Sequence, residues 1–187
     1  MLSDLFYKVV LILWLLLPSY FANSAALLVG GGKPIDFGRS YKGNRIFGKG
    51  KTWRGFIGGI SLGFLLGLLQ QYVARNYIYM IVPPFSSNYT EAALIIITLS
   101  FSAMLGDLIG SFVKRRLGYK SGSELPGVDQ LSFLLCTFLF TYLFVTNFFL
   151  KYFISIEDVM IAVIFTFIIH KTANVFAYLM RRKDVAW

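Results

Sequence analysis

The stretch AALIIITLSFSAMLGDLIGSFVKRR, residues 92–116, decides the class of fold. It begins with a long run that carries no charged side chain, and a helix needs about 20 apolar residues to cross the hydrocarbon core of a bilayer. The stretch ends in three consecutive cations, Lys114-Arg115-Arg116, which suit the headgroup region where a membrane helix emerges. It therefore predicts a transmembrane helix over 92–113.

The composition of the whole chain agrees with a membrane protein. Of 187 residues, 57% are hydrophobic and only 14% are charged, and the mean hydropathy is +0.67. A soluble domain of this length needs more charge to cover its surface. The single cysteine, Cys136, excludes disulfides and metal clusters built on cysteine.

Four further stretches are long enough to cross a membrane, and none alternates apolar and polar residues as a barrel strand does. Because backbone polar groups in lipid must be satisfied within the segment, we expect an all-α, polytopic integral membrane bundle that forms one domain over 1–187. Its five transmembrane helices are expected at 9–29, 55–74, 92–113, 131–150 and 159–180. The first stretch could instead be a signal peptide, but its length and the polar Asn23 favour a mature helix.

The basic residues set the expected orientation. The chain has 18 Lys and Arg against 9 Asp and Glu, and 14 of the 18 lie in the segments 30–54 and 112–128 and in the tail Arg181-Arg182-Lys183. With five spans these segments fall on one side, which the positive-inside rule identifies as the cytoplasm. We therefore expect a multi-pass protein of the cell membrane with its N-terminus outside, its C-terminus in the cytoplasm, and cytoplasmic basic loops at 30–54 and 114–128.

The second span carries a glycine at every fourth position: Gly55, Gly59, Gly63 and Gly67. Such a ridge of small residues lets another helix approach closely. We favour packing within the monomer, and a homodimer seam is the alternative.

Asp107 is an acid near the end of the third span, where an unpaired charge is costly and a functional role is the default hypothesis. Ser111 and Lys114 follow at i+4 and i+7, so an acid, a hydroxyl and a base share one helix face. The alternative is a structural one, in which Lys114 anchors the helix at the headgroups and Asp107 pairs with a neighbour.

Asp129 lies at the start of the fourth span, and a lone Asp there could simply cap the helix. However, spans joined by a short loop are antiparallel neighbours, which brings Asp107 and Asp129 to the same end. Two carboxylates beneath a basic rim suit Mg²⁺, which takes a few carboxylates and completes its shell with water and phosphate oxygens.

Glycines and cations alternate in the loop before the second span, in Gly48-Lys49-Gly50-Lys51-Thr52-Trp53-Arg54-Gly55. Exposed backbone amides and positive charge both favour phosphate binding. The match to a Walker A motif is weak, because Arg45 stands where its first glycine would be. A polybasic segment lying on anionic lipid is the alternative. In the fifth span, His170 and Asn174 share a face at i, i+4 and are candidates for substrate contact or for an interior hydrogen bond.

Three motifs, in this order, resemble those of the CTP-dependent phosphatidate cytidylyltransferase superfamily, and most closely its archaeal CDP-archaeol synthase branch. They are Gly50-Lys51-Thr52-Trp53-Arg54-Gly55, Gly106-Asp107 through Ser111-x-x-Lys114-Arg115, and Leu125-Pro126-Gly127 followed by Asp129-Gln130-Leu131. The segment 33–38, together with His170, Asn174 and Trp187, also fits the archaeal pattern. The likeness spans nearly the whole chain.

The resemblance implies a reaction of phospholipid biosynthesis in which CTP and unsaturated archaetidic acid, an isoprenoid diether of glycerol phosphate, give CDP-archaeol and pyrophosphate. The residues agree, because a lipid phosphate is its own nucleophile and such a displacement needs positioning and charge neutralisation rather than a catalytic triad. We assign Asp107 and Asp129 to Mg²⁺ and Lys114 to charge neutralisation, all three as catalytic residues. The expected substrate-binding residues are Lys49, Lys51, Thr52, Arg54, Ser111, Arg115, Lys120, Pro126, Gly127, His170 and Asn174.

Two other classes of function compete with this one. A small anion channel or transporter would also use a basic vestibule, but it predicts polar residues through the whole membrane depth. A membrane-anchored assembly factor does not need two carboxylates beneath a basic rim. The expected partners are therefore CTP, an isoprenoid ether lipid phosphate and membrane lipids, with a homodimer as the alternative use of the glycine ridge and no nucleic acid.

Overall fold

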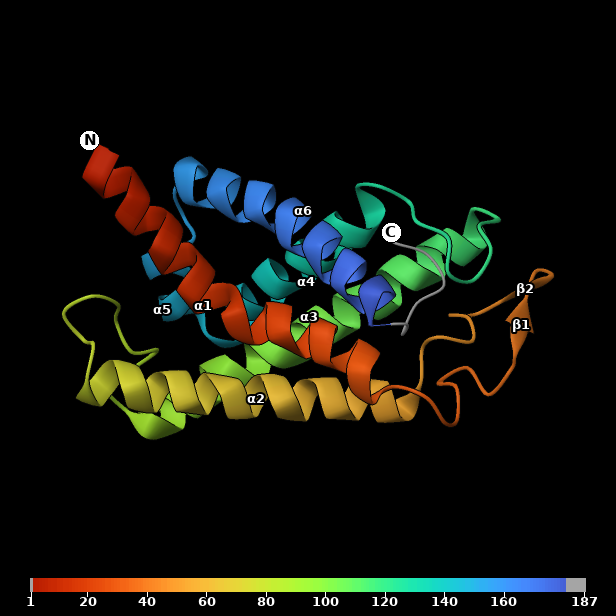
Figure 1. Cartoon of the computed structure of the whole chain (residues 1–187), viewed down its shortest axis with the longest axis horizontal. Helices are drawn as coiled ribbons and strands as arrows, with labels where there is room; N and C mark the ends of the chain where they lie inside the picture. The colour runs from red at the N-terminus through yellow and green to blue at the C-terminus, as the bar shows by residue number, and fades with distance from the viewer. Residues whose placement is uncertain (1, 181–187) are drawn as a thin grey trace.

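The computed structural model describes residues 2–180, which form six helices and one short hairpin (Figure 1). The helices are α1 (Leu2–Val29), α2 (Trp53–Asn76), α3 (Tyr89–Arg116), α4 (Val128–Phe144), α5 (Thr146–Tyr152) and α6 (Ile156–Leu179), and the antiparallel hairpin is β1 (Ser40–Tyr41) with β2 (Asn44–Arg45). The tail residues Arg181, Arg182, Lys183 and Trp187 lie outside the described residues.

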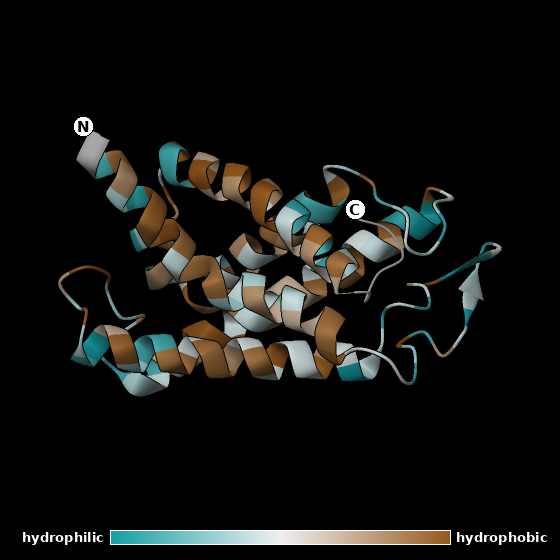
Figure 2. Cartoon of the chain, viewed as in Figure 1, coloured by the Kyte–Doolittle hydropathy of each residue, from teal (hydrophilic) through white to brown (hydrophobic). Residues whose placement is uncertain are grey.

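Among the described residues, four helices are long and apolar enough to cross a membrane. They cover Asp4–Val29, Trp53–Asn76, Tyr89–Arg116 and Ile156–Phe176, and α4 is a shorter apolar helix. The all-helical membrane bundle is thus confirmed within 2–180, apart from the two-residue strands of the hairpin. Figure 2 shows hydrophobic residues along the helices, whereas hydrophilic residues gather in the hairpin and loops.

The expected fourth span, 131–150, is not one continuous helix. α4 ends at Phe144, Val145 adopts φ −138° and ψ 53°, and α5 begins at Thr146. Val145, Phe148 and Phe153 are buried in the hydrophobic core. The apolar residues after Phe144 therefore turn into the bundle instead of extending the helix, and periodicity alone could not distinguish these outcomes.

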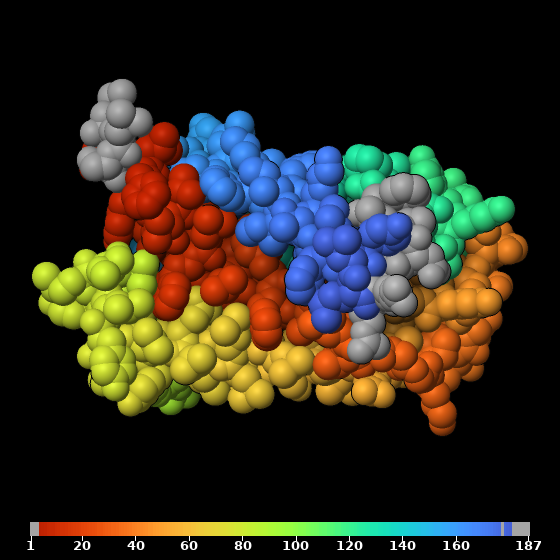
Figure 3. Space-filling model, viewed as in Figure 1, coloured from red at the N-terminus to blue at the C-terminus, as the bar shows by residue number. Residues whose placement is uncertain are grey.

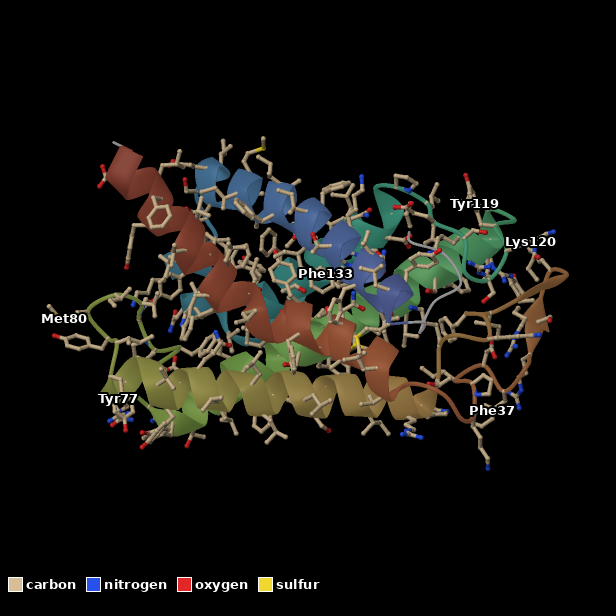
Figure 4. The ribbon with its side chains drawn as sticks, in the orientation of Figure 1. Phe37, Tyr77, Met80, Tyr119, Lys120 and Phe133 are labelled. Carbon is tan, nitrogen blue, oxygen red and sulfur yellow. The ribbon has the colours of Figure 1, made fainter. Side chains whose placement is uncertain are left out.

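Helix α3 lies in the middle of the bundle and packs against α1, α2 and α4. Its Ile95, Ile96 and Leu99 are almost fully buried and share one core with residues of α1 and α4. Phe133 of α4 lies inside the bundle in Figure 4, and its ring stacks on Tyr20 with the centroids 5.6 Å apart. The long helices alternate in direction, so the hairpin and the loop 117–127 lie at the same end (Figure 1).

The glycine ridge of α2 packs within the monomer, as we favoured. All four of its glycines are buried. A Cβ at Gly59 would lie 2.6 Å from the Ala22 carbonyl oxygen of α1, and one at Gly67 would lie 2.2 Å from Ile96 of α3. The ridge therefore lets α1 and α3 approach the α2 backbone.

This close contact predicts that a larger side chain at Gly63 destabilises the protein. A Cβ there would lie 2.7 Å from the Pro18 carbonyl oxygen and 2.8 Å from Ser100 Oγ. Gly63→Leu should lower the thermal midpoint in detergent, because overpacking costs about 1–3 kcal/mol. Ser61→Leu, at an exposed position of the same helix, is the control and should change the midpoint little. Equal midpoints for the two variants would contradict this packing.

Candidate active site

A cavity of about 200 Å³ opens at the end of the bundle that carries the hairpin. Residues from α1, α2, α3, α4, α6 and both basic loops line it. Its polar lining consists of Asn23, Lys51, Thr52, Asp107, Ser111, Lys114, Arg115, Ser121, Ser123, Glu124, Asp129, His170 and Asn174. Nine of these were expected from the sequence, so residues far apart in the chain meet at one site.

The acid, hydroxyl and base of α3 all line this cavity, as their spacing predicts. Asp107 accepts a hydrogen bond from Lys51, with 2.5 Å between Nζ and Oδ2. The side chains of Asp107 and Lys51 are 22% and 24% exposed, so this ion pair is only partly hydrated. The pair joins the middle of the bundle to the basic loop that precedes α2.

Asp129 makes the second ion pair of the cavity. Its Oδ1 lies 2.5 Å from Lys114 Nζ, and its Oδ2 accepts from the Leu125 amide at 3.2 Å. The N-cap of α4 is Gly127 rather than Asp129, and the Gly127 amide donates to Gln130 Oε1 at 2.9 Å. Gly127 has φ 88°, a conformation that favours glycine. The alternative that Asp129 simply caps the helix is therefore wrong. Its carboxylate instead faces the cavity.

The two carboxylates thus line one cavity, but each faces a lysine. Within the described chain, no group of three or more His, Cys, Asp or Glu residues gathers as a ready metal site. Asp107, Asp129 and the Ser111 hydroxyl nevertheless offer hard oxygen donors around one space. Such a set fits a divalent cation that keeps water and phosphate oxygens in its shell.

The backbone on either side of Lys51 is fixed by hydrogen bonds. The Ile35 amide donates to the Lys51 carbonyl at 2.8 Å, and the Trp53 amide donates to the Lys33 carbonyl at 3.1 Å. Thr52 is the N-cap of α2, and its hydroxyl accepts from the amides of Gly55 and Gly31. These contacts place the N-terminus of α2, with its positive end of the helix dipole, at the wall of the cavity.

Asp36 organises the rest of this loop, although no role was assigned to it from the sequence. Its side chain is fully buried, pairs with Arg45, and accepts from the amides of Gly38, Phe47 and Gly48 at 3.0–3.2 Å. Burial raises the pKa of Asp36, but Arg45 and these amides outweigh it and hold the pKa below its usual range. A lone acid in a basic segment was the available signal.

Arg116 fastens the hairpin to the end of α3. Its guanidinium donates to the carbonyls of Tyr41, Asn44 and Arg45, and it lies 5.2 Å from the ring centroids of Tyr41 and Phe112. Asp36 thus fixes the loop through contacts within it, and Arg116 fixes it against the end of α3. The position of Lys51 at Asp107 therefore depends on a folded loop and not on a flexible tether.

Arg115 is a cation buried in the cavity wall. It is 4% exposed, and its Nη1 donates to the Tyr119 carbonyl at 2.5 Å. Its Nε has no hydrogen-bond partner among residues 2–180. A buried donor without a partner is costly, so an incoming anion would be favoured here.

Helices α1 and α6 meet at the cavity through Asn23 and His170. Asn23 Nδ2 and His170 Nε2 lie 3.1 Å apart, and the imidazole lies edge-on to Phe133 with centroids 5.5 Å apart. Asn174 also lines the cavity, as its helical spacing predicts. Asn23 was not assigned to the site from the sequence, although a polar residue in an apolar run was a usable signal.

Five expected substrate contacts are absent from the cavity lining that the described residues form. They are Lys49, Arg54, Lys120, Pro126 and Gly127. Lys49, Arg54 and Lys120 are exposed, and Figure 4 shows Lys120 on the outer loop. Helical or loop spacing could not predict which of the neighbouring cations would turn inward.

The sequence profile of the CarS-like CDP-archaeol synthase family matches residues 4–187. A protein named CDP-archaeol synthase from Thermococcus gammatolerans is 45% identical over 187 residues, covering 100% of this chain and 98% of its own. One of the same name from Archaeoglobus fulgidus is 45% identical over 188 residues, covering 98% and 99%. A solved structure described as an intramembrane enzyme for archaeal membrane lipids biosynthesis superposes with a TM-score of 0.69 at 29% identity, covering 87% and 92%.

The buried Asp36 carboxylate predicts a specific stability defect. Asp36→Ala should lower the unfolding free energy by about 3 kcal/mol, because it leaves Arg45 and the loop amides without their acceptor. Since the pKa of Asp36 is lowered in the fold, its contribution is complete above the ordinary carboxyl pKa and fades only as the pH falls through the folded value. The defect should therefore be equal at pH 5 and pH 8.

Thermal unfolding in detergent measures this effect. The control is Glu157→Ala, which removes an ion pair with Lys8 whose partners are 37% and 49% exposed, and such pairs contribute about 0–1 kcal/mol. An Asp36→Ala protein as stable as the Glu157→Ala protein would refute the loop-organising role of Asp36.

Proposed function

This chain belongs to the CarS-like CDP-archaeol synthase family, and from that premise we propose how its cavity performs the family's reaction. The chain is a CTP-dependent cytidylyltransferase of archaeal lipid biosynthesis and a multi-pass membrane protein. An anion channel, the alternative considered above, receives no support from these relatives.

The reaction joins the phosphate of unsaturated archaetidic acid to the α-phosphorus of CTP. A lipid phosphate oxygen forms the new P–O bond, and the bond from the α-phosphorus to the bridging oxygen of the β-phosphate breaks. The electron pair leaves with pyrophosphate, and the product is CDP-archaeol. The lipid phosphate already carries about −1.5 to −2 charge at neutral pH, so no protein group needs to activate it.

The observation that carries this proposal is that two ion pairs lie in one cavity. They are Lys51 with Asp107 and Lys114 with Asp129. In each pair a lysine neutralises one carboxylate. Asp107, Asp129 and Ser111 would hold a divalent cation, proposed to be Mg²⁺, which would supply charge neutralisation at the triphosphate. Lys51 and Lys114 would bind phosphate oxygens of the substrates.

Two further groups bind phosphate in this proposal. The Arg115 guanidinium lines the cavity, and a planar guanidinium binds phosphate through paired donors. The N-terminus of α2, beside Thr52 and Gly55, brings the positive end of the helix dipole to the cavity wall. We infer that His170 and Asn174, which line the cavity from α6, contact the substrate.

We also propose that α4 is the fifth membrane span and that the cavity faces the cytoplasm. α4 has 17 residues, or about 26 Å at the helical rise, which is close to the thickness of a bilayer core. The alternating helix directions place both basic loops at the cavity end (Figure 1). The positive-inside rule favours the cytoplasm for that end. The glycine ridge of α2 does not support a homodimer, because its glycines are buried within the monomer.

The shared metal site predicts that neither carboxylate can be replaced by an amide. Asp107→Asn and Asp129→Asn should each reduce cation-dependent turnover by at least a hundredfold, because Asn keeps the shape but not the charge. The double variant should be hardly worse than either single one, since residues that act as a unit are not additive. Product formation over a range of Mg²⁺ concentrations, with a thermal melt for each variant, measures this. A folded, active Asp129→Asn enzyme would remove Asp129 from the site.

Lys51 should differ from other cations of the same loop. Lys51→Gln is expected to lower kcat/KM for CTP by about ten- to a hundredfold, because a charge-assisted contact to phosphate contributes about 1.5–3 kcal/mol. Lys42→Gln, which removes an exposed charge from the hairpin turn, should leave kcat/KM within twofold. If both variants lose activity equally, Lys51 acts only through the overall charge of the loop.

A further inference from the structure

An apolar groove runs between α1 and α6 outside the polar cavity. Its walls are Phe21, Ser24, Leu27 and Leu28 from α1 and Ile169, Thr172, Ala173 and Phe176 from α6. Figure 3 shows α1 and α6 exposed on the same face of the molecule. The groove encloses about 420 Å³, within the range of about 300–1,000 Å³ that ligand pockets occupy.

The groove has little capacity for polar recognition. Six of its eight residues are apolar, and the hydroxyl of Thr172 already donates to the Ile168 carbonyl at 2.8 Å. Phe176, at 58% exposure, and Leu28, at 41%, leave large apolar surfaces uncovered. The ligand that suits these walls is therefore a hydrocarbon chain.

The groove and the cavity are neighbours that share one wall residue. Leu27 lines both of them, and each of the two helices presents one strip of residues to the cavity and the next strip to the groove. On α6, His170 and Asn174 face the cavity, whereas Ile169 and Ala173 face the groove. The contact between Asn23 and His170 joins α1 to α6 at the boundary.

We propose that this groove binds an isoprenoid chain of the lipid substrate and that its phosphate reaches the cavity past Leu27. The inference rests on the proposed function, because it presumes that the cavity receives a lipid phosphate. An amphiphile with an apolar chain and an anionic head needs an apolar surface that leads directly to a cationic one. The groove provides the first, and Arg115 and Lys114 in the cavity provide the second.

A second copy of the chain fits the groove less well than a lipid chain. Close helix pairing in membranes uses ridges of small residues, and the small-residue ridge of this protein is buried on α2. The groove walls carry the bulky side chains of Phe21, Leu28 and Phe176, and a hollow lies between them. A hollow with bulky walls suits a flexible chain.

A tryptophan at Ala173 tests the proposal by filling the groove. For the full-length enzyme in detergent, Ala173→Trp should raise the KM for the geranylgeranyl diether phosphate at least tenfold. The KM for CTP and the turnover of a water-soluble diether phosphate with short chains should stay within twofold. Ile164→Trp, at a half-exposed position of α6 that does not line the groove, is the control and should leave all three values unchanged.

The other outcomes are distinguishable. An unchanged KM for the long-chain lipid in Ala173→Trp would overturn the proposal, as would an equal loss with the short-chain substrate, which would indicate damage to the cavity. If the wild-type enzyme transfers cytidylyl groups to neither substrate, the proposed function fails instead. A photoreactive phenylalanine analogue at Phe176 should crosslink to lipid, and a crosslink to a second copy of the chain would overturn lipid occupancy.

Discussion

The ion pair between Lys51 and Asp107 is the constraint on which the rest of the site depends. A carboxylate at the end of an apolar helix is costly unless it is paired or hydrated. The partner comes from a loop 56 residues away in sequence, so that loop must fold back over the end of the bundle. Asp36, Arg45 and Arg116 fix the loop in that position. The charge that α3 carries therefore determines where the basic loop lies.

Helical periodicity was sufficient to predict features that depend on which face of a single helix a residue occupies. The spacing of Asp107, Ser111 and Lys114 correctly placed them on one wall, and the spacing of the α2 glycines correctly predicted a close helix contact. In both cases a regular backbone converts sequence distance directly into direction.

Tertiary packing decided the features that periodicity could not. The apolar run after Phe144 turned into the core because Phe148 and Phe153 could be buried there. Lys51 lines the cavity and Lys49 does not. The reason is that antiparallel pairing with residues 33–35 fixes the backbone around Lys51 and turns its side chain inward. The hydrogen bonds of Asp36 come from backbone amides of a loop. No residue pattern encodes the path of such a loop.

The central claim is that two carboxylates in one cavity hold a divalent cation that brings CTP to a lipid phosphate. The most direct measurement is incorporation of label from radioactive CTP into chloroform-soluble product by the purified enzyme. The account predicts incorporation with archaetidic acid and Mg²⁺, loss of incorporation with excess EDTA, and full recovery when Mg²⁺ is restored. Incorporation that is unaffected by EDTA would contradict it.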